Sequence, residues 1–235
     1  MPPTRQSLHF GRRQLRRLMR HPSMLYRIFS RPNLYFKMPK VASKTIAAAL
    51  SADTLALSHR YSPATVRRLL QLNPGSFKFT FVRHPFTRFC SAYRWAIRED
   101  FRLHRHSLDF HLRQVVLGQG DVNDFCSNLA GLLADKKQRM IHFHPQSAFI
   151  FSGEQGLMDF VGKYECLEQG CAQLRDFHGY DLNVAFGQNE KNRDKTGIED
   201  PMASLAMLGV NAAGVDALRS IYAQDFIAFA YDQQV

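Results

Sequence analysis

Three short apolar runs, each followed by a segment with helical spacing of apolar positions, organise this chain. Leu34–Phe36, Phe77–Val82 and Asp159–Tyr164 are rich in aromatic and β-branched residues, which is typical of buried strands. Phe149–Phe151 fits a further, shorter strand. Because helical segments join the main runs, we expect a short parallel sheet in an α/β fold of one domain. The predicted helices cover Ile46–Leu57, Pro63–Leu72, Pro85–Glu99, Asp121–Ala134, Leu167–Phe177 and Ile221–Tyr231.

The turn between the first predicted strand and the first predicted helix indicates an anion site. Lys40 and Lys44 bring positive charge to this turn, and Ser43 and Thr45 bring hydroxyl donors. Backbone N–H groups at the start of the next helix can hold a phosphate. The alternative is an ordinary turn in which Ser43 or Thr45 only caps the helix, because the glycines and the GxxxxGK[ST] spacing of a Walker A loop are absent.

Arg83 ends the second main strand, at the edge of the sheet where open α/β proteins bind ligands. Pro85 stops the strand, and the chain continues as a predicted helix that carries Ser91 two turns further on. The alternative interpretation of Arg83 is a surface arginine at the end of a strand. For Arg88, on the same helix, we expect an ion pair on the helix surface.

Four motifs in order give the chain a resemblance to a known family. They are PKVASKT, FVRHPFTRFCSAYR, FVGKYECLEQ and IYAQDFIAFAYD. The chain resembles the sulfotransferases, and in particular the carbohydrate branch and its bacterial relatives. The resemblance implies a P-loop-NTPase-like fold and transfer of a sulfuryl group from 3′-phosphoadenosine 5′-phosphosulfate (PAPS), which leaves 3′-phosphoadenosine 5′-phosphate (PAP). It implies no metal.

The resemblance also assigns roles around the donor nucleotide. Lys40 matches the lysine that contacts the bridging oxygen and assists the leaving phosphate, and Arg83 and Ser91 match the pair that binds the 3′-phosphate. A late polar loop, Gln188–Gly197, would close over the nucleotide. The implied donor-binding set is Lys40, Ala42, Ser43, Lys44, Thr45, Arg83, Ser91, Lys191, Asn192 and Arg193.

A general base must take the proton of the acceptor hydroxyl, and histidine titrates near ~6.5. His59 is our first choice, because it lies between the two nucleotide motifs, where some glycan sulfotransferases carry a histidine base. His142 and His144 are the alternative bases. We also expect the acceptor to be bound by His142, His144, Gln146 and Arg98. For Glu165, in the third motif, a catalytic role is the alternative; we expect this motif to pack the strand and to orient the phosphate loop.

The charge of the chain is concentrated at its start. Residues 1–52 hold 11 of the 31 Lys and Arg residues and none of the 20 acids, so the remaining residues hold 31 − 11 = 20 basic and 20 acidic groups. Residues 1–31 are therefore predicted to form a basic amphipathic extension that contacts an anionic membrane peripherally, before a catalytic domain over residues 32–235. The alternative is a solvated helix packed on that domain. With no apolar run of spanning length or signal peptide, the expected location is cytoplasmic.

The four cysteines show no CxxC pair and no zinc spacing, so we expect scattered buried thiols and no metal site. The predicted function is sulfuryl transfer from PAPS to a carbohydrate or glycolipid hydroxyl, with no nucleic-acid partner. A phosphotransferase is the first alternative; it calls for Walker A glycines and a metal-binding acid after a strand, both absent. The second is a non-enzymatic adaptor that binds membrane or nucleic acid through residues 1–31.

Overall fold

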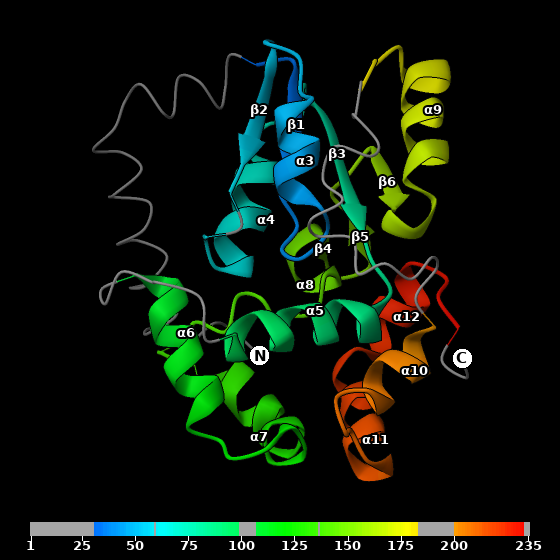
Figure 1. Ribbon diagram of the computed structural model, residues 1–235. Helices are drawn as coiled ribbons and strands as arrows, with labels where there is room; N and C mark the ends of the chain where they lie inside the picture. The colour runs from blue at the N-terminus through cyan, green and yellow to red at the C-terminus, as the bar shows by residue number, and fades with distance from the viewer. Residues whose placement is uncertain (1–30, 59, 99–106, 136, 183–199, 233–235) are drawn as a thin grey trace.

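The computed structural model describes residues 31–58, 60–98, 107–135, 137–182 and 200–232 (Figure 1). Its main sheet has four parallel strands in the order β2-β1-β3-β6. The strands are β1 (Asn33–Phe36), β2 (Thr54–Leu57), β3 (Phe77–Val82) and β6 (Phe160–Lys163). The predicted α/β fold, a short parallel sheet flanked by helices in one domain, is confirmed.

The helices form two groups around this sheet. The first group accompanies the strands and consists of α3 (Ser43–Ala48), α4 (Pro63–Gln71), α8 (Ser147–Ile150) and α9 (Leu167–His178), with a 3-10 turn η1 (Tyr164–Cys166) and the small antiparallel pair β4 (Phe151–Ser152) and β5 (Gln155–Gly156). The second group lies at the end of the sheet toward which β3 points (Figure 1), and it consists of α5 (Pro85–Ile97), α6 (Leu108–Leu117), α7 (Val122–Ala134), α10 (Pro201–Ala206), α11 (Ala212–Ile221) and α12 (Ala223–Ala228). Within the described residues, no helix is both long enough and apolar enough to cross a membrane.

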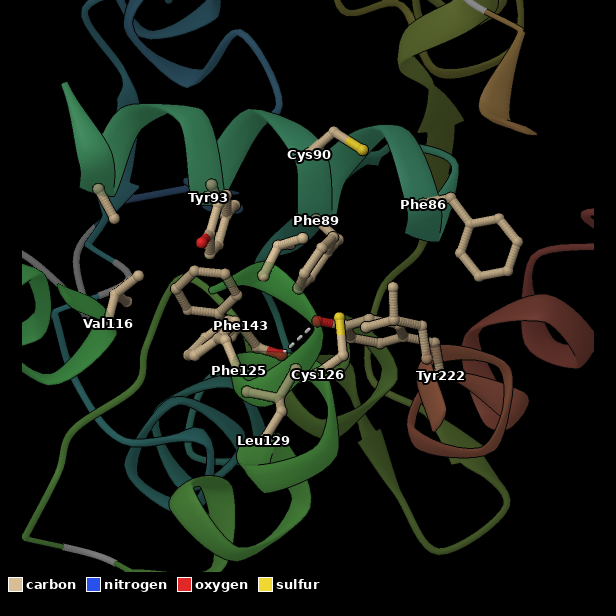
Figure 2. Close-up of a cluster of buried hydrophobic side chains, with 14 of the residues drawn as sticks. Phe86, Phe89, Cys90, Tyr93, Val116, Phe125, Cys126, Leu129, Phe143 and Tyr222 are labelled. Atoms are coloured by element: carbon tan, nitrogen blue, oxygen red, sulfur yellow. Dashed lines mark hydrogen bonds between the residues drawn. The ribbon is translucent and has the colours of Figure 1, made fainter. Parts of the chain in front are cut away.

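Each helix group has its own hydrophobic core. Phe36 and Phe79, both fully buried, belong to the cluster that covers the sheet. In the second cluster, Phe125 lies 6.1 Å from Phe89 and 4.9 Å from Phe143 between ring centroids (Figure 2). Burial of each such ring contributes about 1.5–3 kcal/mol. Helix α5 begins directly after β3, so one continuous segment enters both cores.

Two glycines make room for one core ring at the edge of the sheet. A Cβ atom at Gly162 in β6 would collide with the ring of Phe81, and one at Gly170 in α9 would lie 2.8 Å from it. Phe81 is fully buried in β3 and has no free space into which to turn. The absence of side chains at these two positions therefore lets β6 and α9 pack closely against β3.

The helix predicted over Ile46–Leu57 is wrong in its second half. Helix α3 ends at Ala48, and Thr54–Leu57 forms β2, which pairs in register with β1. The alanine-rich segment favours a helix locally, but the polar turn around Ser51 ends it, and pairing with β1 buries Leu57. Tertiary pairing outweighs the local preference here.

Two further predicted elements differ from the structure. A strand is predicted over Phe149–Phe151, but here the chain first forms α8 and then β4. Asp225 stabilises α8 because it accepts hydrogen bonds from its first turn. The single helix predicted over Ile221–Tyr231 is broken at Tyr222, between α11 and α12. Tyr222 is fully buried, and its hydroxyl donates to the carbonyl of Phe143 at 2.9 Å (Figure 2).

The other predicted elements agree with the structure within a few residues. The helices predicted over Pro63–Leu72, Pro85–Glu99 and Leu167–Phe177 correspond to α4, α5 and α9. Three of the four cysteines are buried, as predicted, but Cys166 is exposed, because it lies at the start of α9 on the outside of the fold. The predicted extension, residues 1–31, lies outside the described residues except for Arg31.

We expect Gly162→Ala to lower the free energy of unfolding by about 1–3 kcal/mol, because the added methyl group overpacks the core at Phe81. Urea denaturation measures this. The matched control is Gly131→Ala in α7, where a Cβ atom meets nothing within 4 Å and the substitution should stabilise the helix by up to about 1 kcal/mol. Equal stability of the two variants would contradict the close packing of β6 on β3.

Candidate functional site

The loop after β1 turns sharply and leads directly into α3. Lys40 and Ala42 both adopt left-handed backbone conformations, with φ of 65° and 39°. Val41, between them, is fully buried and anchors the loop in the core. Such conformations cost of order 1–3 kcal/mol in residues other than glycine, so the loop is shaped at the expense of stability.

Helix α3 begins without a side-chain cap. Ala42 occupies the cap position and offers no polar atom, and the first turn carries no acid. The alternative in which Ser43 or Thr45 serves only as the helix cap therefore does not describe this turn. The loop combines an uncapped helix start with the charges of Lys40 and Lys44, an arrangement that favours an anion.

The Lys40 side chain points toward the far end of α5. Its Nζ atom lies 5.1 Å from the centroid of the Trp95 ring, a cation–π contact. Burial, followed by the positive charge of Arg83, lowers the pKa of Lys40 to about 8, and Asp109 opposes this shift. Lys44 and Arg98 lower this pKa as well. Several positive groups therefore share one partly buried site and repel one another until an anion is bound.

Arg83 lies at the carboxyl end of β3, as predicted. Its Nε atom donates to the Thr87 hydroxyl at 3.1 Å, and its guanidinium lies 4.7 Å from the centroid of the Tyr164 ring. Thr87, Ser91 and Trp95 follow one another at four-residue spacing on α5, so they lie along one face of the helix. This face joins the Arg83 end of the site to the Lys40 end.

The backbone around Arg83 is held by side chains from distant parts of the chain. The Gln146 amide accepts from the Arg83 N–H at 2.9 Å and donates to its carbonyl at 2.8 Å. Glu165 accepts from the His84 N–H at 2.7 Å and from the Tyr231 hydroxyl at 2.8 Å. Glu165 thus links the loop after β3 to Tyr231, near the end of the described chain.

The buried acid Asp225 supports the residues that hold the backbone of Arg83, and it was not identified from the sequence. It is fully buried in α12, and its carboxylate accepts from the N–H of Gln146 at 2.7 Å and from both the N–H and the hydroxyl of Ser147 at 2.7 and 2.6 Å. Asp225 therefore caps α8 and positions Gln146, which in turn holds Arg83. The sequence does carry a signal for this role. Asp225 is an acid that stands directly before the apolar run Phe226–Tyr231.

The expectation for Arg88 is wrong. Arg88 is fully buried and makes no surface ion pair; its two terminal nitrogens donate to the carbonyls of His142 and His144 at 2.9 and 2.7 Å. Its guanidinium also lies 5.4 Å from the centroid of the Tyr222 ring. Buried carbonyl acceptors compensate its desolvation, and Arg88 thereby fixes the segment that contains both histidines.

The two histidines occupy different environments. His142 is buried, with its Nε2 atom 3.5 Å from Asp109 Oδ1 and its ring 4.9 Å from the Trp95 ring. Burial lowers the pKa of His142, and Asp109 partly offsets this. Burial and then Arg88 lower the pKa of His144 to about 4, and its ring packs on Phe149. Both imidazoles are therefore neutral at pH 7.

The structure brings together part of the predicted site. Lys40 lies by Trp95 near the carboxyl end of α5, within electrostatic range of Lys44, Arg98 and His142, whereas Arg83, whose charge also acts on Lys40, lies just before the start of that helix. Gln146 is buried beneath Arg83, with both amide atoms engaged, so its predicted contact with the acceptor stays a prediction. His59, Lys191, Asn192 and Arg193 lie outside the described residues. Among the described residues no group of His, Cys, Asp and Glu could hold a metal ion.

The fold and the site define an α/β protein with a cluster of basic side chains at the carboxyl end of a parallel sheet. The chain belongs to the sulfotransferase family, whose model matches residues 29–232. Carbohydrate sulfotransferase 11 of Mus musculus and that of Rattus norvegicus are each 27% identical to it over 201 residues, which cover 78% of this chain and 54% of each relative. The chain thus spans about half the length of the curated relatives it matches. No solved structure matches it.

We expect the Lys40 ammonium to titrate near pH 8, so that its charged fraction falls as the pH rises through this value. Arg83→Ala should raise the pKa of Lys40 by removing a like charge, and added sulfate should raise it as well. NMR of ¹³C-methylated lysines measures the titration. The control is Arg175→Ala, at an exposed position of α9, which should leave the Lys40 titration curve unchanged. A wild-type titration at the ordinary value of 10.5 would contradict the crowding of charge.

We expect Asp225→Ala to destabilise the protein by about 3–5 kcal/mol, because it leaves two buried N–H donors and one hydroxyl without their acceptor. Asp216→Ala, in the neighbouring helix α11, removes an acid that is 73% exposed and should change stability by no more than about 0.5 kcal/mol. Urea denaturation of both variants provides the comparison. Similar stabilities would show that Asp225 does not secure α8.

Proposed function

We propose that this protein transfers a sulfuryl group from PAPS to a hydroxyl of a carbohydrate or glycolipid acceptor. The observation that carries the proposal is the pairing of Lys40 and Arg83 in one basic site of a sulfotransferase-family chain. The names of the curated relatives support a carbohydrate acceptor. For this chain, a carbohydrate acceptor is our proposal.

The donor would lie along the carboxyl ends of the strands. The α3 turn, with Ala42, Ser43, Lys44 and Thr45, would hold the 5′-phosphosulfate by backbone and hydroxyl hydrogen bonds. Arg83, at the end of β3, and Ser91, on α5, would bind the 3′-phosphate, which distinguishes this donor from ATP. Lys191, Asn192 and Arg193 would complete the nucleotide site.

In the reaction, the bond between sulfur and the bridging oxygen breaks while a bond between sulfur and the acceptor oxygen forms. Negative charge develops on the 5′-phosphate of PAP, and the Lys40 ammonium would neutralise it. A lysine with a pKa of about 8 still carries its charge at neutral pH. The acceptor proton would pass to a base, for which His59 was the first choice and His142 and His144 the alternatives. Burial and Arg88 lower the pKa of His144 to about 4, which makes it a weak proton acceptor at neutral pH.

The features expected of a phosphotransferase are absent from the relevant segments. The loop from Pro39 to Thr45 has no glycine, and His84, not an acid, follows Arg83 after β3. A kinase of this fold class would use an acid there to hold Mg²⁺. A site that selects a 3′-phosphate is therefore the better interpretation of Arg83.

Calorimetric titration with PAP, compared with ADP, tests the donor site. We expect PAP to bind with micromolar affinity and ADP far more weakly. Arg83→Ala should weaken PAP binding about ten- to hundredfold, the loss of one charge-assisted contact worth about 1.5–3 kcal/mol. Arg175→Ala is the control, because it deletes an exposed arginine on α9. Lys40→Ala should lower turnover more than PAP affinity. Equal binding of ADP and PAP, or no binding of PAP, would overturn the proposal.

A further inference from the structure

The Lys40 end of the site contains a carboxylate that sequence reasoning did not single out. Trp95 contacts Lys40 on one side, at 5.1 Å, and the ring of His142 on another, at 4.9 Å. Asp109, in the first turn of α6, contacts His142 and opposes the lowering of the Lys40 pKa. Three elements remote in the sequence thus bring a lysine, a carboxylate and an imidazole to one place.

The exposed fractions of the Asp109 and His142 side chains show which of the two is more accessible to solvent. The Asp109 side chain is 31% exposed, whereas that of His142 is 8% exposed. Asp109 is therefore the more accessible group of the pair, and its Oδ1 atom lies 3.5 Å from His142 Nε2.

The electrostatics also favour Asp109 over His142 as the group that accepts a proton. Burial disfavours the charged form of His142, and the nearby Arg88 and Lys40 disfavour it further. A neutral imidazole can donate one N–H to a carboxylate and hold its orientation, but protonating it in this environment is costly. Asp109, in contrast, is partly exposed and interacts with the Lys40 ammonium, and its carboxylate oxygens can accept a proton.

We propose that Asp109, oriented by His142, is the catalytic base of this protein. The inference rests on the proposed sulfuryl transfer and replaces the histidine base within it. As the acceptor oxygen forms its bond to sulfur, its proton passes to the Asp109 carboxylate, and the bond from sulfur to the bridging oxygen breaks toward PAP. Lys40 neutralises the charge on PAP, so proton acceptance and leaving-group stabilisation occur side by side. His142 is a positioning residue.

A structural role for Asp109 makes a different prediction. An acid in the first turn of a helix stabilises it through the helix dipole. Asp124 provides the matched comparison, because it is an acid in the first turn of α7 and belongs to its capping box. If Asp109 served only its helix, Asp109→Asn and Asp124→Asn would have similar effects on stability and on turnover.

The experiment follows ³⁵S from labelled PAPS into an unsulfated polysaccharide, the probe acceptor, and into inorganic sulfate, and measures PAP in parallel, so that transfer to glycan and transfer to water are both counted. We expect Asp109→Asn to lower the rate about 10²–10⁴-fold, with PAP affinity unchanged or tighter, because a negative charge near Lys40 is removed. Asp124→Asn should turn over normally. Asp109→Glu should recover part of the rate. His142→Gln should lower kcat and leave the KM for the glycan unchanged.

The outcomes separate this inference from the proposed function. An Asp109→Asn variant that folds, binds PAP and turns over at a rate near that of the wild type would overturn the role of Asp109 alone. A wild-type protein that binds no PAP and consumes no PAPS would overturn the sulfotransferase proposal itself. A parallel loss of rate and stability in Asp109→Asn and Asp124→Asn would leave Asp109 as a helix-stabilising acid, which also refutes its catalytic role.

Discussion

The buried carboxylate of Asp225 is the interaction on which the site geometry depends. It accepts four hydrogen bonds from Gln146 and Ser147, and Gln146 also pairs with both backbone groups of Arg83. A fully buried carboxylate is costly unless its oxygens are hydrogen-bonded, so the network tolerates little rearrangement. The C-terminal helix α12 thereby sets the position of an arginine at the end of β3.

The site lies where the two hydrophobic cores meet. Helix α5 follows β3 after Arg83 and runs into the helical cluster (Figure 1). Thr87, Ser91 and Trp95 lie along one of its faces, and Trp95 packs against the helical core. Arg88, on the buried side, holds the backbone of His142 and His144. A single rigid helix therefore relates the Arg83 end of the site to the Lys40 end, which suits a ligand with two separate anionic groups.

The crowding of positive charge around Lys40 suits the anionic donor that we propose. The low pKa of Lys40 arises from burial and from Arg83, with smaller contributions from Lys44 and Arg98. A bound phosphate or sulfate would neutralise the positive groups around Lys40 and relieve their repulsion. Binding would thereby gain back part of the electrostatic free energy that burial costs the free protein. Asp109 is the carboxylate that moderates the repulsion at Lys40, and it does so without closing the site, since its side chain remains partly exposed.

The sequence by itself determined the strands β1, β3 and β6, the helices that follow them, and the place of Arg83 and Lys40 at strand ends, because local periodicity and turn residues carry that information. The tertiary structure decided what depends on contacts between distant segments. Strand β2 forms by pairing with β1, and the break at Tyr222 follows from its bond to Phe143. Burial turned Arg88 from an expected surface residue into a buried donor, and only the packing of α6 on α5 brought Asp109 to His142, since no spacing along the chain encodes such a meeting.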